Sequence, residues 1–130
     1  MYPRKVLIVG GSGFVGSAVA SQLAAAGVAL VLPTRRRDRA RHLLPLPTAE
    51  VVEADVFDPP TLRRLMAGVD AVVSLVGVLH SPSGQPYGPA FARAHVELPT
   101  RLVAAARETG VRRIVHVSAL GADANGPSEY

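Results

Sequence analysis

The stretch KVLIVGGSGFVG, residues 5–16, joins a short apolar run to three evenly spaced glycines near the start of the 130-residue chain. The run Lys5–Val9 is apolar and mostly β-branched, and Gly10 ends it. This pattern predicts a strand buried on both faces of a sheet. Beyond Gly13, apolar residues recur every four positions, the period of a helix, at Val15, Val19 and Leu23. The stretch therefore predicts a strand, a tight glycine turn and a helix in direct succession.

The glycines Gly10, Gly13 and Gly16 stand where a strand–turn–helix unit binds a dinucleotide. Gly10 permits the tight turn out of the strand, and Gly13 lets the backbone approach a pyrophosphate. Gly16 lets the helix pack close to the sheet. The helix N-terminus offers free N–H groups and a positive dipole end to the phosphates. The alternative is a glycine-rich turn that binds no ligand.

The rest of the chain continues the alternation of strands and helices. Further strands are expected at Val28–Leu32, Val51–Asp55, Ala71–Val76 and Arg113–Ser118, with His116 packed within the sheet. Pro33–Arg37 is expected to be a loop. Helices are expected at Asp38–Leu44, from Pro59 or Pro60 to Gly68 behind an Asp58 cap, and over Phe91–Ala106, where Pro99 should kink or divide the helix.

Strands linked by helical crossovers require a parallel sheet that is covered on both faces. The fold class is therefore α/β, a doubly wound, Rossmann-like parallel sheet of five strands with helices on both sides. Residues 1–130 are expected to form one dinucleotide-binding domain, and the fifth strand is expected to lie at an edge.

Composition and charge exclude several other functions. The chain has no Cys, which excludes disulfides, zinc-thiolate sites and a Cys nucleophile. Its net charge is +4, but only Arg35–Arg41 is densely basic and no aromatic residue lies within that run, which argues against nucleic-acid binding. Four scattered His residues do not predict a metal site.

The segment Val6–Thr34 carries no charge and is long enough to span a bilayer, for which roughly 20 apolar residues suffice. Its glycines and its change from strand to helix period argue against a transmembrane span or a signal peptide.

Several segments resemble the extended and atypical short-chain dehydrogenases/reductases, the group of NAD-dependent epimerases and dehydratases. These are the G-x-x-G-x-x-G loop, PTR (33–35), EADV (53–56), LVG (75–77), FARAHVELPTRLVAAA (91–106) and VHVSALG (115–121). The phrases VSLVGVLH, FARAHVELP and VHVSALGAD look most like bacterial relatives of the nucleotide-binding accessory subunit of respiratory complex I. The resemblance covers the whole chain.

The end of the second strand bears on the choice of cofactor. It leads into Arg35, Arg36 and Arg37, with no acidic residue before Asp38. A guanidinium suits the ribose 2′-phosphate, whereas NAD sites usually place a carboxylate here. The sequence therefore favours NADP(H), with NAD(H) as the alternative. In a narrower interpretation only Arg35 faces the site and its neighbours are solvated.

The resemblance implies further contacts with the dinucleotide. Asp55 would accept a hydrogen bond from the adenine amino group, with Val56 beside the ring; the alternative is a capping or loop carboxylate. Gly77 would keep the end of the fourth strand clear for the nicotinamide-side ribose. The other expected contact residues are Ser12, Phe14, Val15, Leu75, Val76 and Ser118.

The catalytic set of the resembling group is Ser, Tyr and a Lys four residues after the Tyr. Ser118 and Tyr130 match the first two, but the chain ends before the lysine, and Lys5 on the first strand cannot replace it. The sequence therefore looks like the N-terminal half of a longer protein. A tyrosine needs a nearby cation before it exchanges protons near neutral pH.

Three functions stay open. The chain is a nucleotide-binding module, a piece of an oxidoreductase or sugar epimerase, or a structural or assembly factor near the respiratory membrane. The expected partners are a dinucleotide and respiratory-chain or membrane-associated proteins. The expected location is the cytoplasm, or the periphery of the inner membrane.

Overall fold

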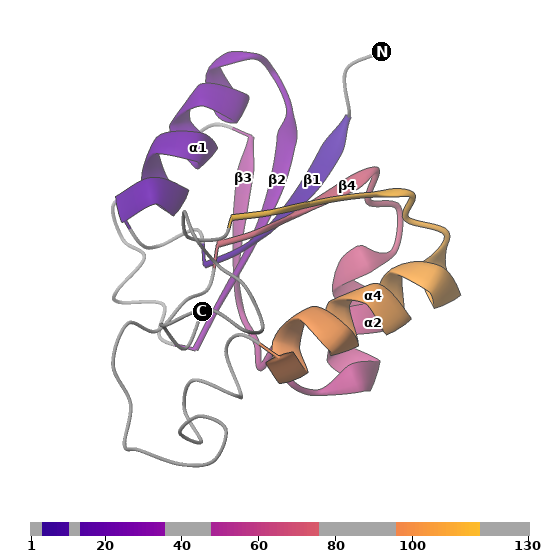
Figure 1. Cartoon of the computed structure of the whole chain (residues 1–130). Helices are drawn as coiled ribbons and strands as arrows, with labels where there is room; N and C mark the ends of the chain where they lie inside the picture. Colours follow the sequence, from indigo (N-terminus) through magenta and orange to yellow (C-terminus); the bar gives the residue numbers. More distant parts are fainter. Residues whose placement is uncertain (1–3, 11–13, 36–47, 76–95, 118–130) are drawn as a thin grey trace, which may run out of the picture.

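The computed structural model describes residues 4–10, 14–35, 48–75 and 96–117 (Figure 1). In chain order the elements are β1 (Lys5–Val9), α1 (Phe14–Ala25), β2 (Ala29–Thr34), β3 (Ala49–Glu53), α2 (Pro59–Met66), β4 (Ala71–Ser74), α4 (Leu98–Thr109) and β5 (Arg113–His116). The helix expected at 38–44 lies outside the described residues.

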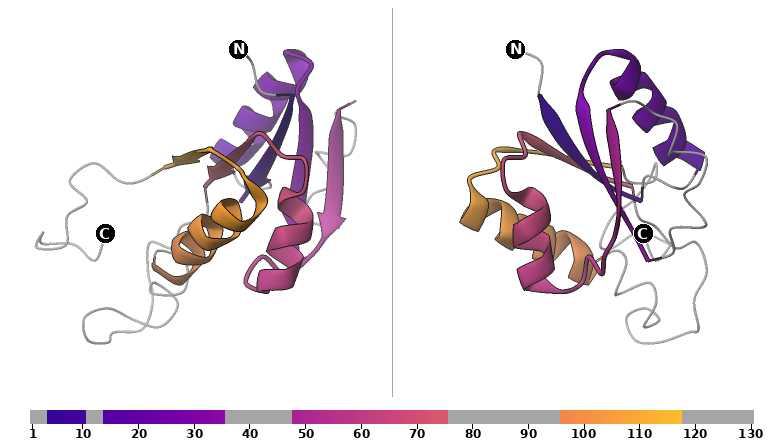
Figure 2. Two further views of the ribbon diagram at one scale, coloured as in Figure 1. Left: turned by 90° about the vertical axis from the view of Figure 1, so that its right-hand side faces the viewer. Right: turned by 180° about the vertical axis from the view of Figure 1, so that it is seen from behind.

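The five strands form one parallel sheet in the order β3-β2-β1-β4-β5. The chain moves from β1 outward to β2 and β3, then crosses back over to β4 and β5 on the other side of β1. Helix α1 covers one face of the sheet, and α2 and α4 cover the other (Figure 2). The predicted doubly wound fold is confirmed.

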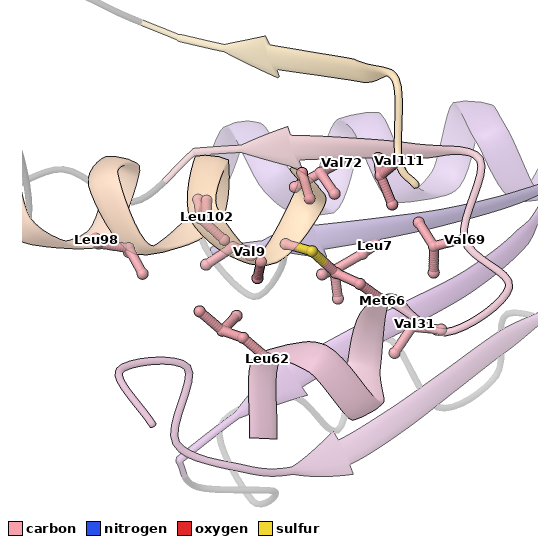
Figure 3. Packing of buried hydrophobic residues seen from close by; sticks show 12 residues of the cluster. Leu7, Val9, Val31, Leu62, Met66, Val69, Val72, Leu98, Leu102 and Val111 are labelled. Carbon is pink, nitrogen blue, oxygen red and sulfur yellow. The ribbon is translucent and has the colours of Figure 1, made fainter. Parts of the chain in front are cut away.

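Strand β1 serves both hydrophobic cores because its side chains alternate between the two faces. Val6 and Ile8 join the core beneath α1, while Leu7 and Val9 join the core beneath α2 and α4. In the second core Leu62 of α2 and Leu102 of α4 converge on β1 (Figure 3). These four side chains, from Val6 to Val9, are almost completely buried, as the apolar run predicts.

Helix α1 is confirmed, but the face that it buries most deeply is not the apolar stripe of Val15, Val19 and Leu23 that predicts the helix in the sequence. Val15 is 52% exposed, whereas the buried positions are Gly16, Ala20 and Ala24. The larger Val19 and Leu23 pack only partly against the core. Small residues let the helix axis approach the sheet, so the stripe of small side chains faces inward and the larger ones flank it.

Strand β2 extends through Pro33 and Thr34, so the expectation of a loop from Pro33 was wrong. Ala29 donates its N–H toward β1, to Arg4, and Leu30 donates toward β3, to Thr48. By this alternation the backbone nitrogen of residue 33 faces β1. The pairing between β1 and β2 ends two residues earlier, at Val31. The proline therefore removes no hydrogen bond of the sheet, and β2 continues along β3.

The other strand ends also differ from the predicted bounds. Strand β3 is Ala49–Glu53 rather than 51–55, because it follows the register of β2, and Asp55 lies beyond it. Strand β4 ends at Ser74 and β5 at His116.

The prediction that His116 packs within the sheet was wrong, because its side chain is exposed. In the described sheet β5 lies at the edge, as expected, and Val115 and Val117 are also about half exposed.

Pro99 is the second residue of α4, and the backbone directly before this helix, at residues 96 and 97, is π-helical. Residues 91–95 lie outside the described part, so the expectation that Pro99 kinks or divides the helix over 91–106 stays a prediction. The helix ends at Gly110, whose φ of 79° is left-handed. Leu98, Leu102 and Ala106 recur every four residues, the period of a helix, and are buried on one face.

The predicted cap of α2 is present. The Asp58 carboxylate accepts hydrogen bonds from the Thr61 backbone N–H at 3.3 Å and from its hydroxyl at 2.6 Å.

Replacing Asp58 with Ala is expected to lower the free energy of unfolding by about 1 kcal/mol, because a terminal N–H loses its acceptor. Urea denaturation measures the change. Asp58→Asn keeps an acceptor oxygen, so its loss in free energy of unfolding should be clearly smaller than that of Asp58→Ala. Equal losses in the two variants would contradict the capping role.

Candidate functional site at the carboxyl edge of the sheet

All five described strands are parallel, so their carboxyl ends meet at one edge of the sheet. Gly10, Arg35 and Leu75 follow β1, β2 and β4 at this edge, and Asp55 lies two residues beyond β3. The chain turns to opposite sides of β1 when it forms β2 and β4. In open α/β sheets ligands bind at such a switch point, in the crevice outside the carboxyl ends. The fold therefore places a candidate ligand site beside the ends of β1 and β4.

Gly10 makes the turn out of β1 with a φ of 87°, in the left-handed region that favours glycine. Helix α1 begins only four residues later, at Phe14, so its N-terminus lies near the same edge. Gly16 is buried on the face of α1 that packs against the sheet. The roles expected of Gly10 and Gly16 thus fit the backbone.

Arg35 and Asp55 bring opposite charges together where β2 and β3 end. The Arg35 Nη2 lies 3.6 Å from Asp55 Oδ1, and the two side chains are 64% and 54% exposed. Asp55 Oδ1 also accepts a hydrogen bond of 3.0 Å from the Phe57 backbone N–H, which shapes the turn after β3. The sequence predicted Arg35 and Asp55 separately, as site residues at two different strand ends. The structure places them next to each other.

The ring of Phe57 lies close to two guanidinium groups. The central carbon of Arg35 is 5.6 Å from the ring centroid, and that of Arg101 is 5.9 Å away. Both distances are within the range of cation–π attraction. Arg101, on α4, also donates a hydrogen bond from Nη1 to the Phe57 carbonyl oxygen. Helix α4 thereby reaches the loop that follows β3.

A shallow hollow of about 350 Å³ opens at this corner, lined by Arg35, Glu53, Ala54 and Asp55. It lies at the ends of β2 and β3, the side of the switch point where a Rossmann-like sheet receives the adenosine half of a dinucleotide. Its walls carry one guanidinium and two carboxylates, so a ligand here would meet both signs of charge.

The other predicted contact residues divide into two groups. Val15 is half exposed in the first turn of α1, Leu75 is partly buried after β4, and Val56 is partly buried against the core beneath α2 and α4. Outside the described residues lie Ser12, Gly13, Arg36, Val76, Gly77, Ser118 and Tyr130, and the side chain of Phe14 is likewise not described. The roles of these residues stay predictions.

Phe57 and Arg101 were not found from the sequence. They are 44 positions apart, and only the packing of α4 beside α2 brings them together. The one local signal is that Phe57 follows the Asp55-Val56 pair directly.

Within the described ranges, no cluster of three or more His, Asp or Glu side chains has the arrangement of a metal site. None of the helices in the described part of the chain has the length and apolarity needed to cross a membrane.

A parallel doubly wound sheet with a glycine turn at its switch point defines a Rossmann-like nucleotide-binding domain. The chain belongs to the NAD dependent epimerase/dehydratase family, whose model matches residues 6–129. The resemblance predicted from the glycine loop and the strand ends is thus confirmed.

Individual relatives include both respiratory subunits and enzymes. The chain is 29% identical over 126 residues to NADH dehydrogenase [ubiquinone] 1 alpha subcomplex subunit 9 of Arabidopsis thaliana, covering 93% of this chain and 30% of that protein. It is 32% identical over 123 residues to cinnamoyl-CoA reductase 1 of rice, Oryza sativa, covering 90% of this chain and 35% of the enzyme.

Among solved structures, a double mutant of DesIV, the dTDP-glucose 4,6-dehydratase of Streptomyces venezuelae, with NAD and DAU bound, matches with a TM-score of 0.73 and 27% identity. The match covers 93% of this chain and 42% of the enzyme. The chain thus spans about a third of the length of these curated relatives and less than half of this solved structure.

Proposed function

We propose that the chain is the dinucleotide-binding domain of a protein of the complex I accessory type, and that it binds NADP(H) in preference to NAD(H). The observation that carries the preference is the exposed guanidinium of Arg35 at the end of β2, in the hollow beside Asp55. In Rossmann-like sites an arginine at this place accommodates the 2′-phosphate of NADP.

The contacts of Arg35 leave its guanidinium available to a phosphate. An exposed ion pair contributes about 0–1 kcal/mol, so the 3.6 Å contact with Asp55 holds Arg35 only loosely. A phosphate offers shorter, charge-assisted hydrogen bonds to the guanidinium fork. The positive φ of Gly10 and the nearby N-terminus of α1 suit the pyrophosphate at the switch point.

Two roles for the bound nucleotide follow from the relatives. The match to the Arabidopsis NADH dehydrogenase subunit supports a structural or assembly role, peripheral at the respiratory membrane, in which the nucleotide stabilises the fold. The match to a reductase supports an enzyme that uses Ser118 and Tyr130 with a lysine supplied beyond this sequence. In the enzyme the nucleotide would supply hydride-transfer chemistry.

Thermal unfolding with each nucleotide tests the proposal. At a hundredfold excess over its Kd, NADPH is expected to stabilise the chain by about 2.7 kcal/mol, which raises Tm by roughly 10 °C for a domain of this size. NADH at the same concentration, if it binds tenfold more weakly, adds about 1.4 kcal/mol. Equal shifts would overturn the NADP(H) preference, and no shift with either nucleotide would overturn nucleotide binding itself.

A further inference from the structure

Arg101 connects a helix to the loop at the adenosine corner of the site. Its neighbours along α4, Leu98 and Leu102, are almost completely buried, so the base of the Arg101 side chain stands on a rigidly packed element. From there its guanidinium donates to the Phe57 carbonyl oxygen and approaches the Phe57 ring to 5.9 Å. This contact crosses 44 positions of sequence and is partly buried.

Among the described residues, several contacts besides that of Arg101 hold this loop. Ala54 donates its N–H to the Thr34 carbonyl oxygen, and Asp58 donates to the Asp55 carbonyl oxygen at 3.3 Å. Phe57 packs partly against the core beneath α2 and α4. A hydrogen bond from a helix side chain to the Phe57 carbonyl therefore adds a fixed point within a short irregular segment.

The same loop holds Arg35. The Phe57 ring lies 5.6 Å from the Arg35 guanidinium, and Asp55, which accepts the Phe57 N–H, lies beside Arg35 as well. Arg35 is 64% exposed, and within the described ranges these two contacts limit the space that its flexible side chain samples. A shift in the position of Phe57 would therefore directly change the contacts of the Arg35 guanidinium.

We propose that Arg101 is a positioning residue for the 2′-phosphate end of NADP(H), acting through Phe57 on Arg35. Arg101 itself does not touch the nucleotide. This inference rests on the proposed function, since it assumes that Arg35 faces the phosphate. It assigns a cofactor-selecting role to α4, a helix that contributes no residue to the glycine loop.

The test is calorimetric titration of the full chain and its variants with NADPH and NADH. Arg101→Met keeps an apolar stem and removes the donor and the planar charge. It is expected to weaken NADPH binding about tenfold, as couplings between contacting groups typically do, and NADH binding less than threefold. Arg101→Lys is expected to recover only part of the loss, because an ammonium lacks the planar fork. The matched control is Arg107→Met, an exposed arginine in the last turn of the same helix.

The ratio of the two affinities separates positioning from folding. If Arg101→Met weakens the binding of both nucleotides by the same factor, the ratio of affinities stays at the wild-type value, and this result would overturn the proposal. The preference of the wild-type chain for NADPH would still support the proposed function. A wild-type chain that binds neither nucleotide would instead overturn the proposed function. If Arg101→Met does not fold, Phe57→Leu removes the ring at similar volume and should lower the ratio by a similar factor; an unchanged ratio there overturns the proposal.

Discussion

Replacing Arg35 with Glu is expected to lower the affinity for NADPH about a hundredfold and to leave the affinity for NADH within a few fold. Hydrogen bonds to a charged group contribute about 1.5–3 kcal/mol, and each 1.4 kcal/mol changes an affinity about tenfold. The new carboxylate would also repel the 2′-phosphate, and it would stand beside Asp55, a second negative charge. Calorimetric titration of the variant with both nucleotides measures the two affinities.

The control for this prediction makes the same change of charge at the other end of the sheet. Arg112 is exposed and precedes β5, away from the carboxyl edge. Arg112→Glu should therefore leave the NADPH/NADH ratio near that of the wild type. If Arg35→Glu binds both nucleotides as the wild type does, Arg35 does not face the ribose and the preference must arise elsewhere.

Replacing Leu62 with Ala is expected to lower the free energy of unfolding by about 3 kcal/mol, within the range of 2–5 that buried Leu→Ala changes show. Leu62 is completely buried in the core between α2, α4 and β1 (Figure 3), so the change leaves a cavity that the sheet cannot close. The whole free energy of unfolding of a native protein is only about 5–15 kcal/mol, so this loss is a large share of it. The urea midpoint should fall with an unchanged slope.

Leu65, on the same helix, is the matched control because it is only partly buried. Leu65→Ala removes the same atoms from a more solvated place, so it is expected to cost about 1 kcal/mol. Equal costs at the two positions would contradict the inward orientation of Leu62.

The parts of the fold that the sequence predicted correctly depend on local signals. The run Lys5–Val9 is too apolar for a solvated strand, Gly10 takes a left-handed turn, and Asp58 caps a helix that starts with two prolines. The alternation of such elements leaves a parallel, doubly wound sheet as the compact arrangement. The candidate site was predictable to the same extent, because Arg35 directly follows β2, Asp55 lies two residues beyond β3, and the carboxyl ends of parallel strands share one edge.

The errors arose where a residue's environment depends on a distant neighbour. Pro33 continues β2 because β1 no longer pairs there, and His116 is exposed because β5 lies at the edge of the described sheet. The inward face of α1 is formed by Gly16, Ala20 and Ala24, since close approach to the sheet outweighs the size of the buried side chain.

The sequence by itself determined the order of the elements, the glycine turn after β1 and the charged residues at the strand ends, because each follows from the conformational and burial preferences of adjacent residues. Only the tertiary structure decided that Arg101 reaches the Phe57 carbonyl and that Phe57 meets Arg35. These contacts require α4 to pack beside α2 on one face of the sheet. Packing between elements far apart in the chain has no local pattern, so the connection to the candidate cofactor site emerges only in the folded molecule.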